Sequence, residues 1–276
     1  MTDGESPATT ATFASATLWI VDLDGVVWLT GEPIGPVDRA VAALRSHGIR
    51  VVFATNNSAP TTAELIGRLH RIGIGSCGDD LATSAGAVAS LLLPGQRVRV
   101  LAEGGVTESL AARGVEMVEA GGSGAVDAAV VGWSRAFDFA ALAATATAAR
   151  ESGRLLATNE DPTHPTPEGL MPGSGALLAA VSVASGITPE VAGKPHPAMV
   201  RLLEERFGVA DPDASVVMIG DQARTDGRLA DRLGIPFGLV DSGVTPASAR
   251  DFDVPVGLRA PDFVSLVRKC LGPEAL

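Results

Sequence analysis

Strand-like and helix-like segments alternate along nearly the whole chain of 276 residues. Apolar runs typical of buried strands occupy residues 18–21, 49–54 and 216–219. Residues 37–47 and 61–71 have the apolar periodicity of amphipathic helices, and a glycine follows each of them within two residues. Because parallel strands are joined by helical crossovers, the alternation predicts an α/β fold, a doubly wound parallel sheet with a second, smaller α/β domain.

The composition narrows the classes of partner. The chain is 46% hydrophobic, which is ample for a folded core, and its formal net charge of −11 at pH 7 has the wrong sign for nucleic acid. An anionic small substrate is still compatible, because a metal ion and a few local cations invert the field of a site. No apolar run is long enough to cross a bilayer. We therefore expect neither a nucleic acid nor a membrane as partner.

The cysteines and the N-terminus bear on where the protein works. Cys77 and Cys270 lie far apart and match no metal-binding spacing, so we interpret them as free thiols in a reducing cytoplasm. Residues 1–16 lack both the basic start and the long apolar core of a signal peptide, and they are predicted to be a disordered tail. These features predict a cytoplasmic location.

The first apolar run ends in the sequence Asp22-Leu23-Asp24-Gly25. Successive residues of a strand point to opposite faces, so two aspartates one residue apart converge only if the chain turns there. Like charges held close repel unless a cation lies between them, and Mg²⁺ prefers such oxygen ligands. One carboxylate can attack phosphorus, a second can move protons, and Gly25 lets the backbone approach a phosphate. The alternative interpretation is a turn with two solvated aspartates.

Two further polar clusters suit a phosphate. Residues 55–58, Thr-Asn-Asn-Ser, directly follow the apolar run 49–54, where a hydroxyl and backbone N–H groups suit phosphate oxygens. The alternative is an N-terminal helix cap. Lys194 lies between Gly193 and Pro195, in a loop where its charge suits neutralisation of a phosphate. Here the alternative is a surface lysine before a helix.

The fourth cluster follows the apolar run 216–219. Asp221 stands at the end of that run as a good metal ligand. Asp226 falls on the first turn of the next helix, where it orients a metal-bound water or, alternatively, complements the helix dipole. Each cluster alone has an ordinary structural explanation. In an open parallel sheet, however, sites lie outside the carboxyl ends of the strands, and these clusters fall at such ends or in loops.

The spacing of the clusters predicts the domain organisation. About half of the 276 residues separate residues 55–58 from Lys194. A long insertion between two parts of one site indicates a second domain that lies over it. We place this cap, or substrate-specificity, domain at 85–175 and the catalytic core at 17–84 and 176–276.

In this order, the four clusters resemble those of the haloacid dehalogenase superfamily of phosphatases, from about Leu18 to Thr245. The mid-chain insertion resembles the NagD-like, or 4-nitrophenylphosphatase-like, subclass with a large C2-type cap. Further marks of that subclass stand at residues 55–58, 157–159, 161–163 and 172–176. The resemblance implies a Rossmannoid core and Mg²⁺-dependent hydrolysis of a phosphomonoester through an aspartyl-phosphate.

The resemblance also implies roles for the acidic residues. Asp22 is similar to the nucleophile, which is also a metal ligand, and Asp24 to the general acid/base, whose backbone carbonyl reaches the metal. Asp221 is similar to the third protein ligand of Mg²⁺, and Asp226 to a carboxylate just outside the ligand set. The presence of both Asp22 and Asp24 argues against the dehalogenase reaction, which needs neither Mg²⁺ nor the second aspartate.

The remaining implied roles concern the substrate. Thr55 and Asn56 resemble the phosphate-binding residues, with Asn57 near them, and Lys194 resembles the lysine that neutralises charge. His164 matches a histidine with which pyridoxal phosphatases contact their substrate, and the alternative is a loop histidine without a ligand. The implied substrate is a small phosphate ester such as glycerol phosphate, phosphoglycolate, pyridoxal phosphate or a sugar phosphate. A homodimer through the cap is also implied.

Two other functions use similar residues. A phosphomutase shares all four clusters and differs in how it excludes water, although a bulky cap favours hydrolysis. A phospho-accepting receiver domain also combines an aspartate, a threonine, a lysine and Mg²⁺ on a doubly wound sheet. Asp24 and the long insertion argue against the receiver, and phosphate release over many turnovers discriminates the two.

Overall fold

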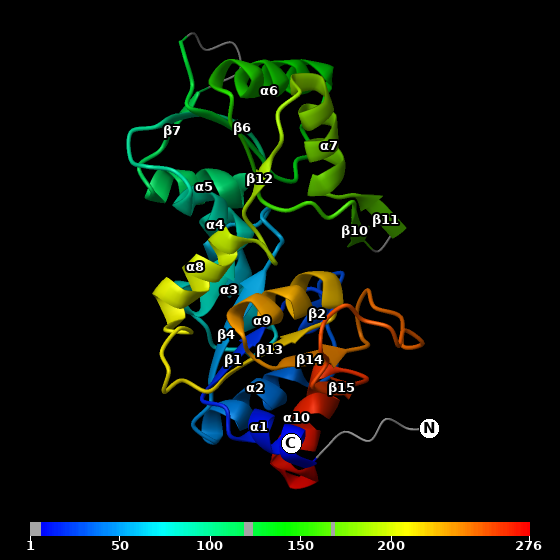
Figure 1. Ribbon diagram of the computed structural model, residues 1–276. Helices are drawn as coiled ribbons and strands as arrows, with labels where there is room; N and C mark the ends of the chain where they lie inside the picture. The colour runs from blue at the N-terminus through cyan, green and yellow to red at the C-terminus, as the bar shows by residue number, and fades with distance from the viewer. Residues whose placement is uncertain (1–6, 119–123, 167–168) are drawn as a thin grey trace. The chain divides into compact units, whose positions relative to one another are not determined.

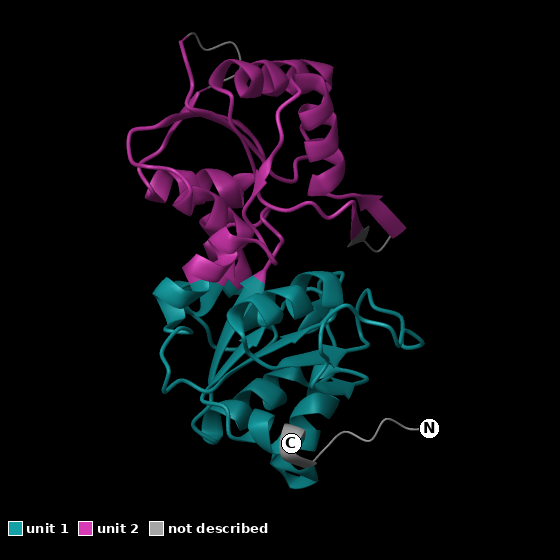
Figure 2. Ribbon diagram, in the orientation of Figure 1, with its two compact units in different colours: residues 1–54, 66–81, 203–276 teal, residues 55–65, 82–202 magenta. Residues whose placement is uncertain are grey.

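The computed structural model describes residues 7–118, 124–166 and 169–276 and divides into two compact units (Figure 2). The first unit comprises residues 1–54, 66–81 and 203–276, and the second comprises residues 55–65 and 82–202. Four elements cross from one unit to the other: β4 (Arg50–Thr55), by its last residue, α3 (Thr62–Arg71), β5 (Leu81–Thr83) and α8 (Pro197–Phe207).

The first unit is built on a six-stranded sheet with the strand order β15-β14-β13-β1-β4-β5. Besides β5, its strands are β1 (Leu18–Val21), β4 (Arg50–Thr55), β13 (Val216–Gly220), β14 (Phe237–Val240) and β15 (Leu258–Ala260). The pairings from β15 to β4 are all parallel. From β1 the chain continues to β4 and β5 in one direction, and from β13 it continues to β14 and β15 in the other. The order therefore reverses between β1 and β13, which is where such sheets hold their ligands.

Helices cover both faces of this sheet, as the predicted doubly wound core requires. Because parallel crossovers are right-handed, connections that run in opposite directions along a sheet place their helices on opposite faces. Helix α2 (Val37–Ser46), between β1 and β4, packs with α10 (Phe263–Leu271), whereas α9 (Arg228–Leu233), between β13 and β14, lies on the other face (Figure 1). Shorter elements complete the unit: β2 (Trp28–Leu29), β3 (Glu32–Pro33), η1 (Gly78–Asp80), η2 (Ala223–Gly227) and η3 (Pro273–Ala275).

The N-terminal segment corrects one expectation. Residues 1–16 were predicted to be a disordered tail, but α1 (Pro7–Ala14) is a helix that packs against α10. Its Phe13 is fully buried and meets the ring of Trp19 edge-on at a centroid distance of 6.2 Å. The Trp19 indole N–H donates to the Phe13 carbonyl at 3.2 Å. Tertiary burial of one aromatic side chain thus orders a segment whose local sequence is unremarkable, while residues 1–6 lie outside the described residues.

The second unit is also an α/β unit, with a parallel sheet of its own in the order β12-β9-β8-β6-β7. Its strands are β6 (Arg97–Leu101), β7 (Glu116–Val118), β8 (Ala128–Val131), β9 (Leu155–Ala157) and β12 (Glu190–Val191), with a hairpin of β10 (Thr163–Thr166) and β11 (Gly169–Pro172). Its helices are α4 (Ser84–Ser90), α5 (Gly104–Ala112), α6 (Phe139–Ser152) and α7 (Ser174–Ser185), with most of α8. The predicted fold class, with two α/β bodies, is confirmed.

The boundaries of this unit differ from the predicted 85–175. Helix α7 packs against α6, and its residues Leu177, Leu178 and Val181 join the core formed by β8 and β9. The unit continues to residue 202, and the predicted core segments lose residues 55–65, 82–84 and 176–202 to it. The small apolar residues of α7 indicated close packing but carried no information about which sheet the helix covers.

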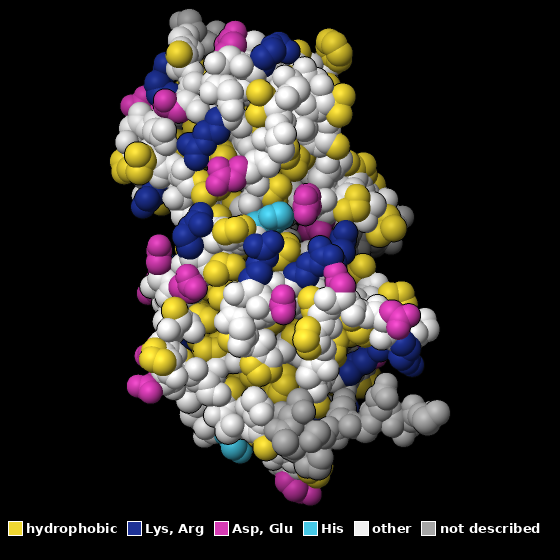
Figure 3. Space-filling model, in the orientation of Figure 1, with side chains coloured by type: hydrophobic (Ala, Val, Ile, Leu, Met, Phe, Trp, Pro, Cys, Tyr) yellow, Lys and Arg dark blue, Asp and Glu magenta, His cyan; other side chains and the backbone are white. Residues whose placement is uncertain are grey.

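The surface and the helix lengths complete the description. Figure 3 shows basic and acidic side chains interspersed over the drawn face. Within residues 7–118, 124–166 and 169–276, none of the helices has the length and apolar character needed to span a bilayer.

Candidate functional site

Three buried carboxylates gather at the switch point of the first sheet. Asp22 follows β1, Asp221 follows β13, and Asp226 lies in η2. One oxygen from each lies within 4.8 Å of the others, and the residues are 6%, 0% and 0% exposed, respectively. Three carboxylates this close repel one another and are costly to bury unless positive charge is supplied. A set of hard oxygen donors suits a divalent cation such as Mg²⁺, so the residues fit the predicted metal.

The backbone explains why these three side chains meet. Strands β1 and β13 pair in parallel up to Val21 and Ile219, and the Asp22 N–H donates to the Ile219 carbonyl at 2.9 Å. The next residues on both strands therefore leave the sheet side by side. The helix on whose first turn Asp226 was predicted to lie begins as a π-helical turn, η2, and this turn carries Asp226. Insertions of this kind are frequent at functional sites because they redirect a side chain.

The loop after β14, residues 241–257 (the β14 loop), holds the carboxylate of Asp221. The Val244 N–H donates to Asp221 Oδ2 at 2.6 Å. A Cβ atom on Gly243 would lie 2.0 Å from the same oxygen, and one on Gly25 would lie 2.6 Å from it. The Ser242 hydroxyl donates to the Gly25 carbonyl at 2.7 Å and so joins the two glycine turns. Asp221 is therefore enclosed by backbone that leaves no room for a side chain.

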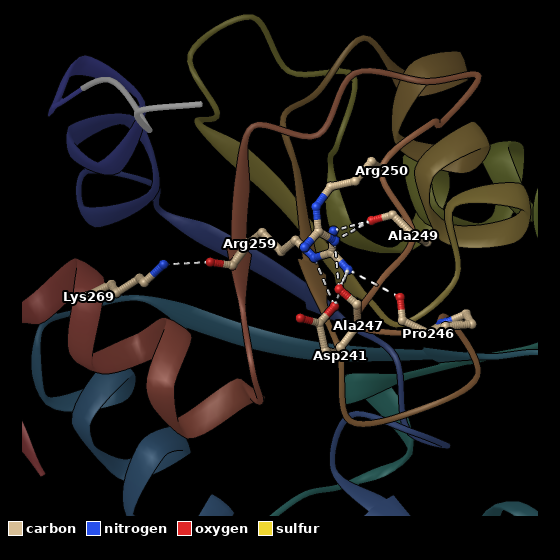
Figure 4. Close-up of polar contacts among 7 residues, drawn as sticks. All are labelled: Asp241, Pro246, Ala247, Ala249, Arg250, Arg259 and Lys269. Carbon is tan, nitrogen blue, oxygen red and sulfur yellow. Dashed lines mark hydrogen bonds and ion pairs between the residues drawn. The ribbon is translucent and has the colours of Figure 1, made fainter. Parts of the chain in front are cut away.

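Arg259, in β15, fixes the conformation of the β14 loop (Figure 4). Its guanidinium forms an ion pair with Asp241 at 2.8 Å. It also donates to the carbonyls of Ala249 at 2.6 Å, Ala247 at 3.2 Å and Pro246 at 3.3 Å. The planar guanidinium offers five N–H donors, so one side chain can tie several turns of a loop together.

We expect Arg259→Met to lower the free energy of unfolding by about 2 kcal/mol, because Asp241 loses its cation in a largely buried position. The release of the β14 loop is expected to accelerate hydrogen exchange at the Val244 N–H. Urea unfolding and amide exchange measure the two effects. Arg150→Met is a matched control, since exposed Arg150 also donates to a backbone carbonyl, and its cost is expected to be within about 0.5 kcal/mol. Unchanged exchange at Val244 in Arg259→Met contradicts the role.

Asp24 stands apart from the three-carboxylate cluster. Its side chain is half-buried, and Oδ1 accepts a hydrogen bond from the Trp28 indole N–H at 3.0 Å. The family resemblance implies that Asp24 contributes its backbone carbonyl to the metal and its carboxyl group to proton transfer. A carboxylate held outside the cluster suits the second of these tasks, and both remain predictions.

In the second unit, Asn56 and Lys194 are joined by their amides. Asn56 Oδ1 accepts the Lys194 N–H at 2.7 Å, and Asn56 Nδ2 donates to the Lys194 carbonyl at 3.1 Å and to Asp161 Oδ2 at 3.3 Å. The Asn56 carbonyl accepts from the Ser84 hydroxyl and from Asn159 Nδ2, both at 2.7 Å. The side-chain amide of Asn56 is therefore used to hold three loops together. We therefore expect any hydrogen bond from Asn56 to a phosphate to come from its backbone N–H.

Lys194, Thr55 and Asn57 lie around the same turn. Lys194 is 3% exposed and Thr55 is 1% exposed, so Lys194 is not the surface lysine of the alternative interpretation. Thr55 Oγ1 accepts the Asn57 N–H at 3.0 Å, and Asn57 Oδ1 accepts the Ala59 N–H at 3.2 Å. These local bonds order residues 55–59 before α3 begins.

His164 lies in the hairpin of β10 and β11. Its imidazole ring faces the indole of Trp133 at a centroid distance of 6.0 Å. The Trp133 indole N–H donates to the Pro172 carbonyl of β11 at 3.0 Å, which fixes the indole against the hairpin. The structure therefore groups His164 with Trp133. Prolines stand at positions 162, 165 and 167 around His164, and the last of these lies outside the described residues.

Several residues that act through the backbone or through a single donor were not predicted from the sequence. Val244 and Gly243 contact Asp221, Trp28 contacts Asp24, and Ser84 contacts Asn56. The sequence did contain one indication of Val244 and Gly243. The residues Asp-Ser-Gly directly follow the apolar run 237–240, as other clusters follow their strands. The contact of Ser84 with Asn56 depends on tertiary structure, and the contact of Trp28 with Asp24 depends on the conformation of a local turn.

Two family models match the chain. The haloacid dehalogenase-like hydrolase model matches residues 19–116, and a second model, described as HAD-hydrolase-like, matches residues 191–265. The first match contains Asp22 and Thr55, and the second contains Lys194 and Asp221. Every cluster except the hairpin around His164 thus falls within a matched segment.

Known proteins resemble the chain over most of its length. D-glycerol 3-phosphate phosphatase from Mycobacterium tuberculosis is 35% identical over 249 residues, which cover 89% of this chain and 68% of that protein. The crystal structure of a glycerol phosphate phosphatase from the same organism, in complex with magnesium, is 33% identical with a TM-score of 0.81 and covers 93% of this chain and 78% of its own. The 4-nitrophenylphosphatase from Thermotoga maritima is 25% identical with a TM-score of 0.83, covering 94% of this chain and 99% of its own.

Proposed function

This chain belongs to the haloacid dehalogenase-like hydrolases and is a phosphatase of that family, and we propose that it hydrolyses small phosphomonoesters with Mg²⁺ as cofactor. The observation that carries the proposal is the cluster of Asp22, Asp221 and Asp226, three buried carboxylates at the switch point of a parallel sheet. The magnesium complex of the related glycerol phosphate phosphatase supports the choice of ion.

The proposed ligands of the metal are Asp22, Asp221 and the backbone carbonyl of Asp24. Asp226, buried beside them, is proposed to orient water at the site, and its Oδ2 also accepts the Gln222 N–H at 3.2 Å. When bound, the ion supplies positive charge that offsets the carboxylates and the phosphate. The Val244 N–H holds Asp221 Oδ2 in place.

The proposed reaction has two steps. In the first, an oxygen of Asp22 attacks phosphorus, the P–O ester bond breaks, and Asp24 gives its proton to the leaving oxygen. In the second, water attacks the same phosphorus, the bond to Asp22 breaks, and Asp24 takes the proton from that water. Splitting one displacement into two in this way makes each easier, and one carboxyl group serves as acid and then as base.

The charge on the transferring phosphoryl group is proposed to be stabilised by the residues that the family resemblance assigns to phosphate binding. The Thr55 hydroxyl, the Asn56 N–H and neighbouring Asn57 donate to its oxygens, and the Lys194 ammonium neutralises them. Burial supports this role for Lys194, since a charge in a water-poor setting acts more strongly than one on the surface. Positioning and electrostatic stabilisation account for most of the rate enhancement in phosphoryl transfer.

The substrate is proposed to be a small phosphorylated metabolite. The related glycerol 3-phosphate phosphatase supports glycerol phosphate as a candidate, beside phosphoglycolate, pyridoxal phosphate and sugar phosphates. We assign the choice among them to the second unit, acting as a cap, with His164 as a contact. A homodimer through this unit and a cytoplasmic location also remain proposals.

A phosphatase panel tests the proposed function. The chain is incubated with these metabolites and with 4-nitrophenyl phosphate, and released phosphate is measured over many turnovers. We expect at least one metabolite to reach a kcat/KM of about 10⁴ M⁻¹s⁻¹, and chelation by EDTA to lower the rate about 100-fold until Mg²⁺ is restored. No release from any ester, or a rate indifferent to EDTA, contradicts the proposal. A single long-lived adduct indicates a receiver, and isomerisation without release indicates a phosphomutase.

A further inference from the structure

Trp28 is placed to control the carboxyl group of Asp24. It begins the hairpin of β2 and β3 and is fully buried, and its indole N–H donates to Asp24 Oδ1 at 3.0 Å. We propose that Trp28 is a positioning residue for proton transfer by Asp24, an inference that rests on the proposed function of the site. The hydrogen bond assigns the two oxygens of Asp24 to different tasks.

The backbone fixes the distance between the two side chains. The Gly25 N–H donates to the Trp28 carbonyl at 2.7 Å, and the Trp28 N–H donates to the Leu23 carbonyl at 3.1 Å. The Val27 N–H also donates to the Leu23 carbonyl, at 2.9 Å. These bonds close a tight turn whose two ends carry Asp24 and Trp28. The indole is therefore built into the same turn as the carboxyl group and needs no further element to reach it.

The chemistry of the indole gives the hydrogen bond a direction. An indole N–H donates and never accepts, so Oδ1 must offer it a lone pair in both protonation states of Asp24. When Asp24 carries a proton, Oδ1 is the better acceptor as the carbonyl oxygen, and the proton belongs on Oδ2. Trp28 thereby keeps the transferable proton on one oxygen and holds the rotation of the carboxyl group, as a general acid and base requires.

Arg68, in α3, strengthens this arrangement. Its guanidinium lies over the indole ring of Trp28, 5.3 Å from the ring centroid, within the range of a cation–π interaction. A cation on the ring face draws electron density from the indole and makes its N–H a stronger donor. The buried ring is also locked between the cation and the turn, which opposes rotation away from Asp24.

Substitution of Trp28 by phenylalanine keeps a ring for Arg68 and removes the N–H. The measurement is kcat/KM for two esters, because this ratio reports the step in which the leaving group departs. The leaving group of glycerol 3-phosphate is a basic alkoxide that needs a proton, whereas the leaving group of 4-nitrophenyl phosphate is a stable phenolate. We expect Trp28→Phe to lower kcat/KM about 30-fold for the alkyl ester, or for the best alkyl ester of the panel, and at most about 3-fold for the aryl ester.

Two further variants make the test decisive. Trp19→Phe removes another fully buried indole N–H, which donates to the Phe13 carbonyl at 3.2 Å, and we expect it to change both esters equally. If Trp28→Phe does not fold, 3-benzothienylalanine at position 28 keeps the bicyclic shape without the N–H, and the same alkyl-selective loss is expected.

Equal losses on both esters at position 28, or the alkyl-selective loss in Trp19→Phe, would overturn the role of Trp28. Failure of the proposed function has a different signature. In that case the unaltered chain releases no phosphate from either ester, or Asp24→Asn shows no preference between them.

Discussion

Replacement of Asp22 by asparagine is expected to lower the turnover of 4-nitrophenyl phosphate by at least about 10⁴-fold. The amide is a poor nucleophile, so the aspartyl-phosphate cannot form, and no other side chain in the cluster takes over. Asp221 Oδ2 is held by the Val244 N–H, and Asp226 Oδ2 by the Gln222 N–H. Release of 4-nitrophenol under steady-state conditions, with Mg²⁺ in excess, measures the loss.

The control for this variant is Asp79→Asn. The Asp79 side chain is 96% exposed, and its pairing with Arg206 is a long surface contact of 3.7 Å. Removal of such a charge is expected to leave the turnover within about 2-fold of the unaltered chain. Turnover by Asp22→Asn near that of the control would show that another group attacks phosphorus, and the proposed mechanism would then fall.

The position of the acidic cluster could be predicted from sequence because Asp22 and Asp221 each directly follow an apolar strand. Strand ends are recognisable locally, and the rule that parallel sheets bind ligands at their carboxyl ends supplies the rest. Asp22 and Asp221 meet because β1 and β13 are neighbours, although about 200 residues separate them in the chain of 276. That neighbourhood follows from the doubly wound topology, which the alternation of strands and helices predicts.

Other features could not be predicted from the sequence because they depend on contacts between distant parts of the chain. The helix α1 is ordered by burial of Phe13 against Trp19, and nothing in residues 7–14 alone requires it. The second unit ends later than predicted because α7 packs on α6, a choice that its small apolar residues leave open. The roles of Val244 and Gly243 are invisible in composition, since one acts through its backbone N–H and the other through the absence of a side chain.

Replacement of Gly243 by alanine is the second change for which we expect a large effect on the site. Its backbone carries no positive φ, so an alanine there is not strained by conformation, and the cost is purely steric. The new Cβ would lie 2.0 Å from Asp221 Oδ2 and 2.5 Å from its Cγ, distances that no rotation of the methyl group can relieve. Either the β14 loop moves away or the carboxylate leaves its place, and both outcomes break the bond from the Val244 N–H to Asp221.

We therefore expect Gly243→Ala to weaken Mg²⁺ binding about 100-fold, the upper range for groups that orient a metal ligand. Titration calorimetry with Mg²⁺ measures the affinity directly, and the dependence of phosphatase activity on Mg²⁺ concentration should shift by a similar factor. Gly67→Ala is the matched control, because no atom lies within 4 Å of its added Cβ in α3. That change is expected to stabilise the helix by about 0.5–1 kcal/mol without altering the affinity. Equal Mg²⁺ affinities in the two variants would show that the contact between Gly243 and Asp221 does not shape the metal site.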